Sequence, residues 1–71
     1  MDQEALDKAL DGPGMPGIDA IMAFENGELD QDQVVQLIQH GIDHSWVWSL
    51  QGFYGRTAVS LIDAGLCHPK A

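Results

Sequence analysis

Apolar residues recur at helical spacing along most of the chain, most clearly over residues 30–44. At 100° per residue, the apolar and small residues of this segment fall in one arc of about 160°, opposite the glutamines, histidines and Asp43. The arc consists of Val34, Val35, Leu37, Ile38, Gly41 and Ile42. Asp30 as N-cap and Gln33 three positions later predict a capping box. The segment therefore predicts an amphipathic helix that ends near His44.

Two further segments predict core helices, over residues 18–26 and from about residue 53 to residue 64. The expected inner residues are Ile18, Ile21, Met22 and Phe24 in the first, and Tyr54, Ala58, Leu61 and Ile62 in the last. Gly65 is expected as the left-handed residue that ends the last helix, with Leu66 folding back onto Leu61.

The N-terminal part of the chain is set apart by its glycines and prolines. Residues 2–11 have the spacing of a short amphipathic helix, which is marginal alone and must either dock or fray. The run GPGMPG at residues 12–17 breaks both helical and strand periods, which indicates a linker. The pattern predicts an all-α fold: a three-helix domain at 18–67, an acidic N-terminal segment and linker at 1–17, which can add a short helix, and a tail at 68–71.

The length of 71 residues fits one domain with a thin core. Cys67 is the only cysteine, which excludes a disulfide within the chain. The acidic N-terminus lacks the apolar run of a signal peptide, and no apolar stretch reaches the ~20 residues that span a bilayer. We expect a soluble domain without a membrane segment.

The formal net charge of −8 is concentrated in one half of the sequence. Residues 1–32 hold nine carboxylates against one lysine, whereas the acidic and basic residues of 33–71 cancel. Such a field repels phosphate backbones, so direct nucleic-acid binding is not expected. The acidity either keeps a small protein in solution or pairs with a basic partner.

Several residues could in principle form a catalytic or metal-binding site, but the sequence favours ordinary structural roles for them. His40 and His44 are four residues apart, and Cys67 and His68 could complete a site, but both helix histidines lie on the polar arc. The acidic residues 25–32 do not match a calcium loop, and Ser45 and Ser60 are expected in ordinary helical or corner positions, whereas a nucleophilic serine needs a strained turn. We expect no metal, no cofactor and no enzymatic activity.

Four aromatic residues cluster within nine positions: Trp46, Trp48, Phe53 and Tyr54. A core this small hardly encloses both tryptophans. We expect Trp48 and Tyr54 to be core residues and Trp46 to be an exposed apolar contact.

Residues 18–67 resemble a group of short bacteriophage proteins of unknown function. The matching stretches are MAFENGELD at 22–30, LIQH at 37–40, WSLQGFYGRTA at 48–58 and LIDAG at 61–65. The pattern W-x-LQG-x-YGR is the most specific of these. The resemblance implies an accessory protein in the host cytoplasm, and it implies no reaction.

The function that these patterns favour is a protein–protein interaction module, such as an inhibitor of a host transcription, nucleic-acid-processing or defence protein. The alternative is a phage protein that self-associates, as a homodimer for example; a helix–turn–helix DNA binder is disfavoured because its recognition helix would offer only Arg56. The residues expected to bind the partner are Glu25, Glu28, Asp32, Trp46, Gln51 and Arg56. Those expected to be structural are Asp30, Gln33, Trp48, Tyr54 and Gly65.

Overall fold

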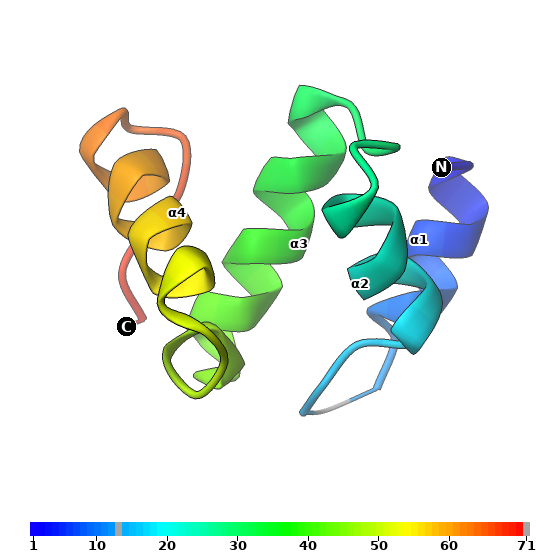
Figure 1. The fold of residues 1–71 in the computed structure, drawn as a ribbon, viewed down its shortest axis with the longest axis horizontal. Helices are drawn as coiled ribbons and strands as arrows, with labels where there is room; N and C mark the ends of the chain where they lie inside the picture. Colours follow the sequence, from blue (N-terminus) through cyan, green and yellow to red (C-terminus); the bar gives the residue numbers. More distant parts are fainter. Residues whose placement is uncertain (13, 71) are drawn as a thin grey trace.

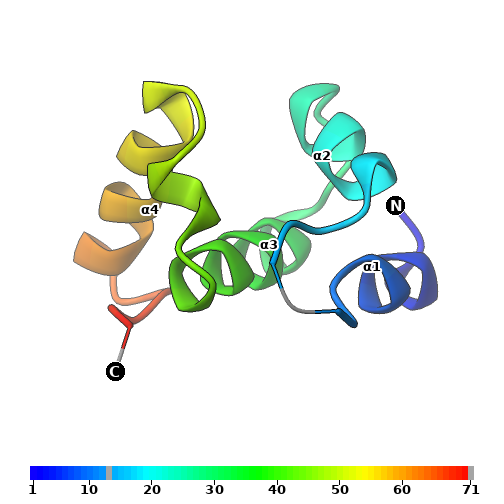
Figure 2. The same ribbon diagram turned by 90° about the horizontal axis from the view of Figure 1, so that it is seen from below.

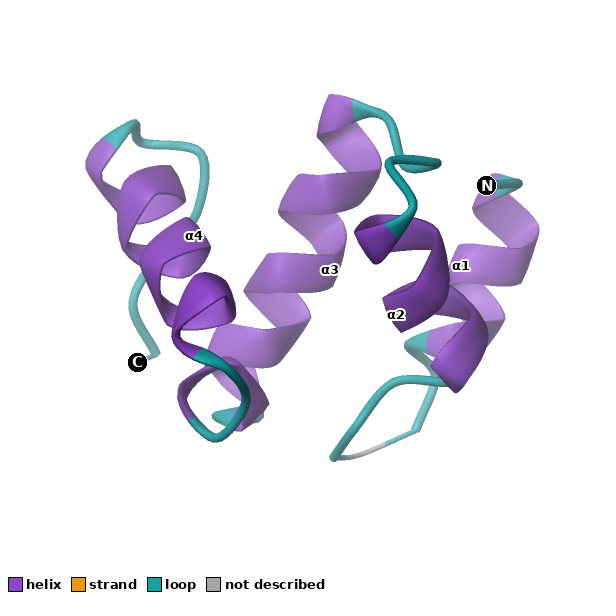
Figure 3. Cartoon of the chain, viewed as in Figure 1, coloured by secondary structure: helices purple, strands orange, loops and turns teal. Residues whose placement is uncertain are grey.

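The computed structural model describes residues 1–12 and 14–70. Four α-helices and one 3₁₀ helix follow each other along the chain, and these residues contain no strand (Figure 3). The helices are α1 (Gln3–Ala9), α2 (Ile18–Glu25), α3 (Gln31–Asp43), η1 (Trp46–Trp48) and α4 (Gly52–Asp63). The all-α prediction is confirmed.

Helix α3 is the centre of the molecule. In Figure 1 it stands between α4 on one side and α1 with α2 on the other, and Figure 2 shows the same arrangement after a quarter turn. The acidic helices α1 and α2 are therefore grouped on one side of α3, and α4, which belongs to the half without net charge, is on the other.

The start of α3 shows why this helix is strongly specified. The Asp30 carboxylate accepts a hydrogen bond from the Gln33 backbone N–H at 2.9 Å, and the Gln33 side chain accepts one from the Asp30 N–H at 3.3 Å. Both bonds of the predicted capping box are present, so backbone donors at the helix start are satisfied locally. Asp30 and Gln33 therefore have their expected structural roles.

The core consists of side chains from all four helices, from the η1 turn and from Cys67 in the segment after α4. Its fully buried members include Leu6, Leu37, Ile38, Ile42 and Val47. Leu6 belongs to α1, so the N-terminal helix docks on the domain instead of fraying. The side chains of Gln3 and Gln36 join α1 to α3 by a hydrogen bond of 2.7 Å.

The buried face of α2 matches the prediction only in part. Ala20 and Ala23 are buried, whereas Ile18 and Met22, expected in the core, are 72% and 52% exposed. Small side chains let neighbouring helices approach closely, so the alanine face packs inward here. Ile21 and Phe24 are partly buried against the core, as expected.

The end of α4 follows the predicted geometry. Gly65 has φ +77°, and the Leu66 N–H donates to the Leu61 carbonyl at 2.9 Å. This confirms the structural role of Gly65 as the left-handed residue that closes the helix.

The linker and tail predicted at residues 12–17 and 68–71 contain no helix where they are described. Pro13 and Ala71 lie outside the described residues. Among the described residues, no helix is long and apolar enough to cross a membrane.

Candidate functional site

The two tryptophans have exchanged the positions that the sequence predicts for them. Trp46 is 4% exposed and belongs to the core, whereas Trp48 is 50% exposed. Ser45 adopts a left-handed conformation (φ 66°) directly after α3 and turns the chain back, so that η1 packs on the helix it has just left. The predicted exposure of Trp46 and the predicted core position of Trp48 are therefore both wrong.

Gly41 and His40 hold Trp46 in place. A Cβ atom on Gly41 would lie 2.2 Å from Val47 Cγ1 and 3.0 Å from the Trp46 ring, so the η1 turn occupies the space that a side chain would need. Trp46 Nε1 donates a hydrogen bond of 2.9 Å to His40 Nδ1. A lone glycine inside the apolar arc of a helix is a signal of such a close approach, and it was available in the sequence.

The hydrogen bond from Trp46 determines the tautomer of the neutral His40 ring. An indole N–H can only donate, so Nδ1 of His40 accepts, and in the neutral ring Nε2 carries the proton and faces the Gly12 carbonyl at 3.4 Å. Burial lowers the pKa of His40, with a smaller lowering from His44, against raising effects of the Gly12 carbonyl and Asp43. His40 is therefore a structural group and not a solvated side chain of the polar face.

An aromatic cluster joins the C-terminus of α2 to the start of α4. Tyr54 is 3% exposed, as expected of a core residue, and its hydroxyl donates to a Glu25 carboxylate oxygen at 2.6 Å. The Phe24 and Phe53 rings stack with their centroids 5.6 Å apart. Burial, followed by the hydrogen bond and the charge of Glu25, raises the pKa of Tyr54 to about 12.

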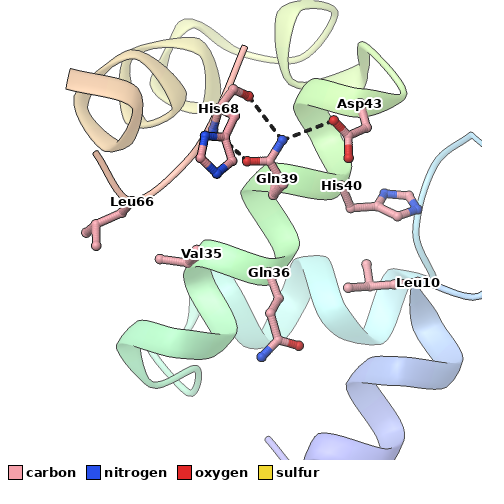
Figure 4. A pocket seen from close by; sticks show the side chains of 8 residues that line it. All are labelled: Leu10, Val35, Gln36, Gln39, His40, Asp43, Leu66 and His68. Atoms are coloured by element: carbon pink, nitrogen blue, oxygen red, sulfur yellow. Dashed lines mark hydrogen bonds between the residues drawn. The ribbon is translucent and has the colours of Figure 1, made fainter. Parts of the chain in front are cut away.

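A pocket of about 490 Å³ lies between α3, the end of α1 and the chain after α4 (Figure 4). Gln39 lines the pocket and binds the C-terminal tail through two hydrogen bonds. Its side-chain amide donates to the His68 carbonyl at 3.0 Å and accepts from the His68 N–H at 2.7 Å. In Figure 4 the Gln39 amide also points to Asp43, with which it has a hydrogen bond of 3.0 Å, while the His40 ring turns away. No sequence pattern indicates that Gln39, among the polar residues of α3, contacts the tail.

The side chains considered for a metal site serve other contacts. The His40 and His44 ring centroids are 4.3 Å apart with the rings tilted by 38°, and Cys67 is buried with its thiol directed at the Val35 carbonyl. Burial raises the pKa of the Cys67 thiol, which opposes the thiolate form that metals bind. No group of three or more histidine, cysteine or acidic residues with metal-binding geometry occurs among the described residues.

The outer side of α2 is an exposed apolar surface surrounded by carboxylates. Ile18, Met22 and Glu25 lie within an arc of about 60° at 100° per residue, opposite the buried alanines. Met15, in the linker before the helix, is 52% exposed, and Asp19 is also exposed. We call Met15, Ile18, Asp19, Met22 and Glu25 the α2 surface.

The outer side of α4 is a second apolar surface, with an open groove of about 550 Å³. The groove is lined by Trp48, Gly52, Gly55, Arg56, Val59 and Ser60. Val59 is 50% exposed, and the Trp48 ring lies against Gly55, where a Cβ atom would be at the ordinary contact distance of 3.6 Å. Arg56 extends back over Gly52. We call this set the α4 surface; four of its six residues fall in the W-x-LQG-x-YGR stretch at 48–56, and Val59 and Ser60 follow it.

The predicted partner-binding residues do not form a single patch. Gln51 and Arg56 lie at the exposed start of α4. Glu25 contacts the same end of that helix by accepting the hydrogen bond from the Tyr54 hydroxyl. Glu28 and Asp32 are exposed in the α2–α3 turn and the first turn of α3. Sequence reasoning missed Ile18, Met22 and Val59 because each has the spacing or type of a core residue.

Comparison with known proteins places most of the chain in one family. A family model described as a domain of unknown function, DUF7417, matches residues 17–71. The chain belongs to the DUF7417 family. The matched segment begins one residue before α2, so that α1 lies outside it. No curated protein and no solved structure matches this DUF7417 chain.

Proposed function

We propose that this DUF7417 protein is a protein-binding module without catalytic activity, and that its α2 surface docks on a partner with a basic, amphipathic surface. The observation that carries the proposal is the outward side of α2, where Ile18 and Met22 are each more than half exposed, together with Met15 in the preceding linker, which is exposed to the same extent. Single exposed apolar residues are ordinary, but three within eight positions are typical of a contact surface. Methionine suits such a surface because its flexible side chain adapts to different shapes.

The charges around this surface define the chemistry of the partner. Asp19 and Glu25 border the apolar side chains, and all nine carboxylates of residues 1–32 are exposed. The described residues offer them one ion pair, between Lys8 and Glu4 at 3.9 Å, and it is exposed. An apolar centre with an acidic rim complements a segment that has leucines on one side and lysines or arginines around it.

The resemblance to short bacteriophage proteins supplies the setting of the proposal. In the cytoplasm of an infected bacterium, the proteins with large basic surfaces are those that handle nucleic acids. We therefore propose a host transcription, nucleic-acid-processing or defence protein as the target, with the acidic module occupying its basic surface. This is the role of an accessory inhibitor.

The proposal is tested with a labelled amphipathic peptide of leucine and lysine, with its leucine–glutamate counterpart as control. Fluorescence anisotropy should show binding of the basic peptide alone, weakened by added salt because exposed charges are screened beyond about 8 Å at physiological ionic strength. The double variant Ile18→Ser/Met22→Ser should raise Kd roughly tenfold or more, since both side chains lose apolar burial in the complex. Val59→Ser, which removes a half-exposed apolar side chain from α4, is the control and should leave Kd unchanged.

Two outcomes would contradict the proposal: equal binding of both peptides, or equal weakening by the α2 and α4 variants. The wild-type protein and the Ile18→Ser/Met22→Ser variant then serve as paired baits in a host lysate. A protein retained by the first and lost by the second is the candidate target.

A further inference from the structure

The exposed side of α4 has a pattern that complements itself. At 100° per residue, Gly52, Arg56, Val59 and Asp63 fall within an arc of about 60°, opposite the buried Tyr54 and Ala58. Their spacing of four, three and four residues is that of a seam between two packed helices. The small side chain of Ser60 beside the seam leaves room for another backbone to approach.

The two charges of this seam are placed symmetrically. Arg56 lies three positions before Val59, and Asp63 lies three positions after Ser60. Two antiparallel copies of α4 that meet at Val59 and Ser60 therefore bring each Arg56 opposite the Asp63 of the other copy. Among the described residues, neither side chain has an ion-pair partner within its own chain.

The distribution of charge also favours this side for the approach of a second copy. Each chain carries a formal charge of −8, and residues 33–71 contribute none of it. Helix α1 and the body of α2 lie beyond α3 as seen from α4 (Figures 1 and 2), and α2 reaches α4 only at its C-terminus, on the inner side of α4 where Tyr54 contacts Glu25. Two copies that meet through α4 thus keep their acidic halves far apart, which reduces the long-range repulsion.

We infer that the α4 surface binds a second copy of this chain as an antiparallel, two-fold symmetric dimer. Val59 is at its centre, Arg56 and Asp63 pair at its two ends, and the exposed Trp48 ring covers the edge of the partner helix. The α2 surfaces remain on the outside of the dimer, free for the proposed partner. A typical stable interface takes about 800 Å² from each partner, roughly a fifth of the 4307 Å² surface of this chain. One helix face supplies less, so the dimer dissociates at micromolar concentrations.

The symmetry of the pairing gives a sharp test by sedimentation equilibrium, over roughly 10 to 1,000 µM protein. The wild-type chain should show a monomer–dimer equilibrium. Arg56→Asp places two carboxylates opposite each other and Asp63→Arg places two guanidinium groups opposite each other, so each variant should dimerise roughly tenfold more weakly or worse. An equimolar mixture of the two variants should dimerise again, because every like-charged pair becomes an opposite pair. The double variant Arg56→Asp/Asp63→Arg should dimerise like the wild type.

Controls separate this pairing from the general effect of net charge and from loss of fold. Lys8→Asp and Asp11→Arg, both on the α1 side, change the net charge by the same two units as Arg56→Asp and Asp63→Arg and should leave dimerisation unchanged. Ile18→Ser/Met22→Ser should also leave it unchanged, which distinguishes this interface from the α2 surface. Circular dichroism should report the same helicity for all variants. A wild-type mass that stays monomeric at every concentration overturns the inference, as does a mixture that fails to restore the dimer.

Discussion

At the scale of single residues, Gly41 is the position on which the packing of the η1 turn depends. Val47 and Trp46 fill the space in front of its Cα atom, and both are buried. Gly55 on α4 is the contrasting case, because a Cβ atom there meets the Trp48 ring at an ordinary distance of 3.6 Å. Gly41 thus contacts the tryptophan that is buried in the core, Trp46, whereas Gly55 contacts the exposed one, Trp48.

Gly41→Ala should destabilise the protein, although alanine favours the helix. The added methyl group would lie 2.2 Å from Val47 Cγ1, and a valine in a packed core cannot swing away. Overpacking of this kind costs about 1–3 kcal/mol, against a gain of roughly 1 kcal/mol in helix propensity. Urea denaturation should therefore show a net loss of up to about 2 kcal/mol for Gly41→Ala. Gly55→Ala is the control and should be neutral or stabilising; equal effects of the two substitutions would refute the explanation.

His40 should make the stability depend on pH below its ordinary pKa. Burial lowers its pKa in the fold, so the unfolded chain takes up the proton first as the pH falls. The contribution of neutral His40 is therefore complete above about pH 6.5 and decreases as the pH falls from there toward the lowered pKa. A proton on Nδ1 would also face the Trp46 N–H, donor against donor.

The measurement is the free energy of unfolding at pH 8 and at pH 5.5, for the wild type and for His40→Gln. A glutamine carbonyl can still accept from Trp46 but does not titrate, so the wild type should lose more stability than the variant over this interval. The other charged groups are common to both proteins, so the comparison isolates the contribution of His40. An identical loss in both proteins would show that His40 is not responsible.

At the scale of elements, the sequence specifies ends of helices better than it specifies faces. The capping box of α3 and the left-handed Gly65 after α4 are local interactions, and both occur as predicted. Which face of α2 is buried depends on what packs against it, and the docking of α1 puts Ala20 and Ala23 inside. Ile18 and Met22 have the spacing of core residues, so periodicity could not reveal them as a surface.

The same difference explains what could be predicted of the candidate sites. Exposure of Arg56 and Gln51 at the start of α4 follows from their polar character and position. The burial of Trp46 depends on contacts with His40 and Gly41, within a segment too short to show a period. The hydrogen bonds between Gln39 and His68 join residues 29 positions apart, and a contact over that distance produces no local pattern in the sequence.

At the scale of the whole molecule, the segregation of charge has a consequence for stability. The acidic half packs α1, α2 and the start of α3 together, with nine exposed carboxylates and one lysine. Folding brings these charges closer than they are in the unfolded chain, so self-repulsion opposes the fold. The ion pair between Lys8 and Glu4, whose side chains are 79% and 78% exposed, offsets little of this repulsion.

Added sodium chloride should therefore stabilise the protein between about 0.01 M and 0.15 M, the range over which the screening length falls from roughly 30 Å to 8 Å. Urea denaturation at low protein concentration measures this without a contribution from association. Asp11→Asn/Glu28→Gln should raise the stability at low salt and reduce its dependence on salt. Asp11 follows the C-terminus of α1, where the helix dipole is negative, so its neutralisation alone should contribute on the order of a few tenths of a kcal/mol. Asp63→Asn, in the half of the sequence that has no net charge, is the control and should leave the salt dependence unchanged. A wild-type protein that loses stability as salt is added would mean that attractive pairs, and not self-repulsion, dominate its electrostatics.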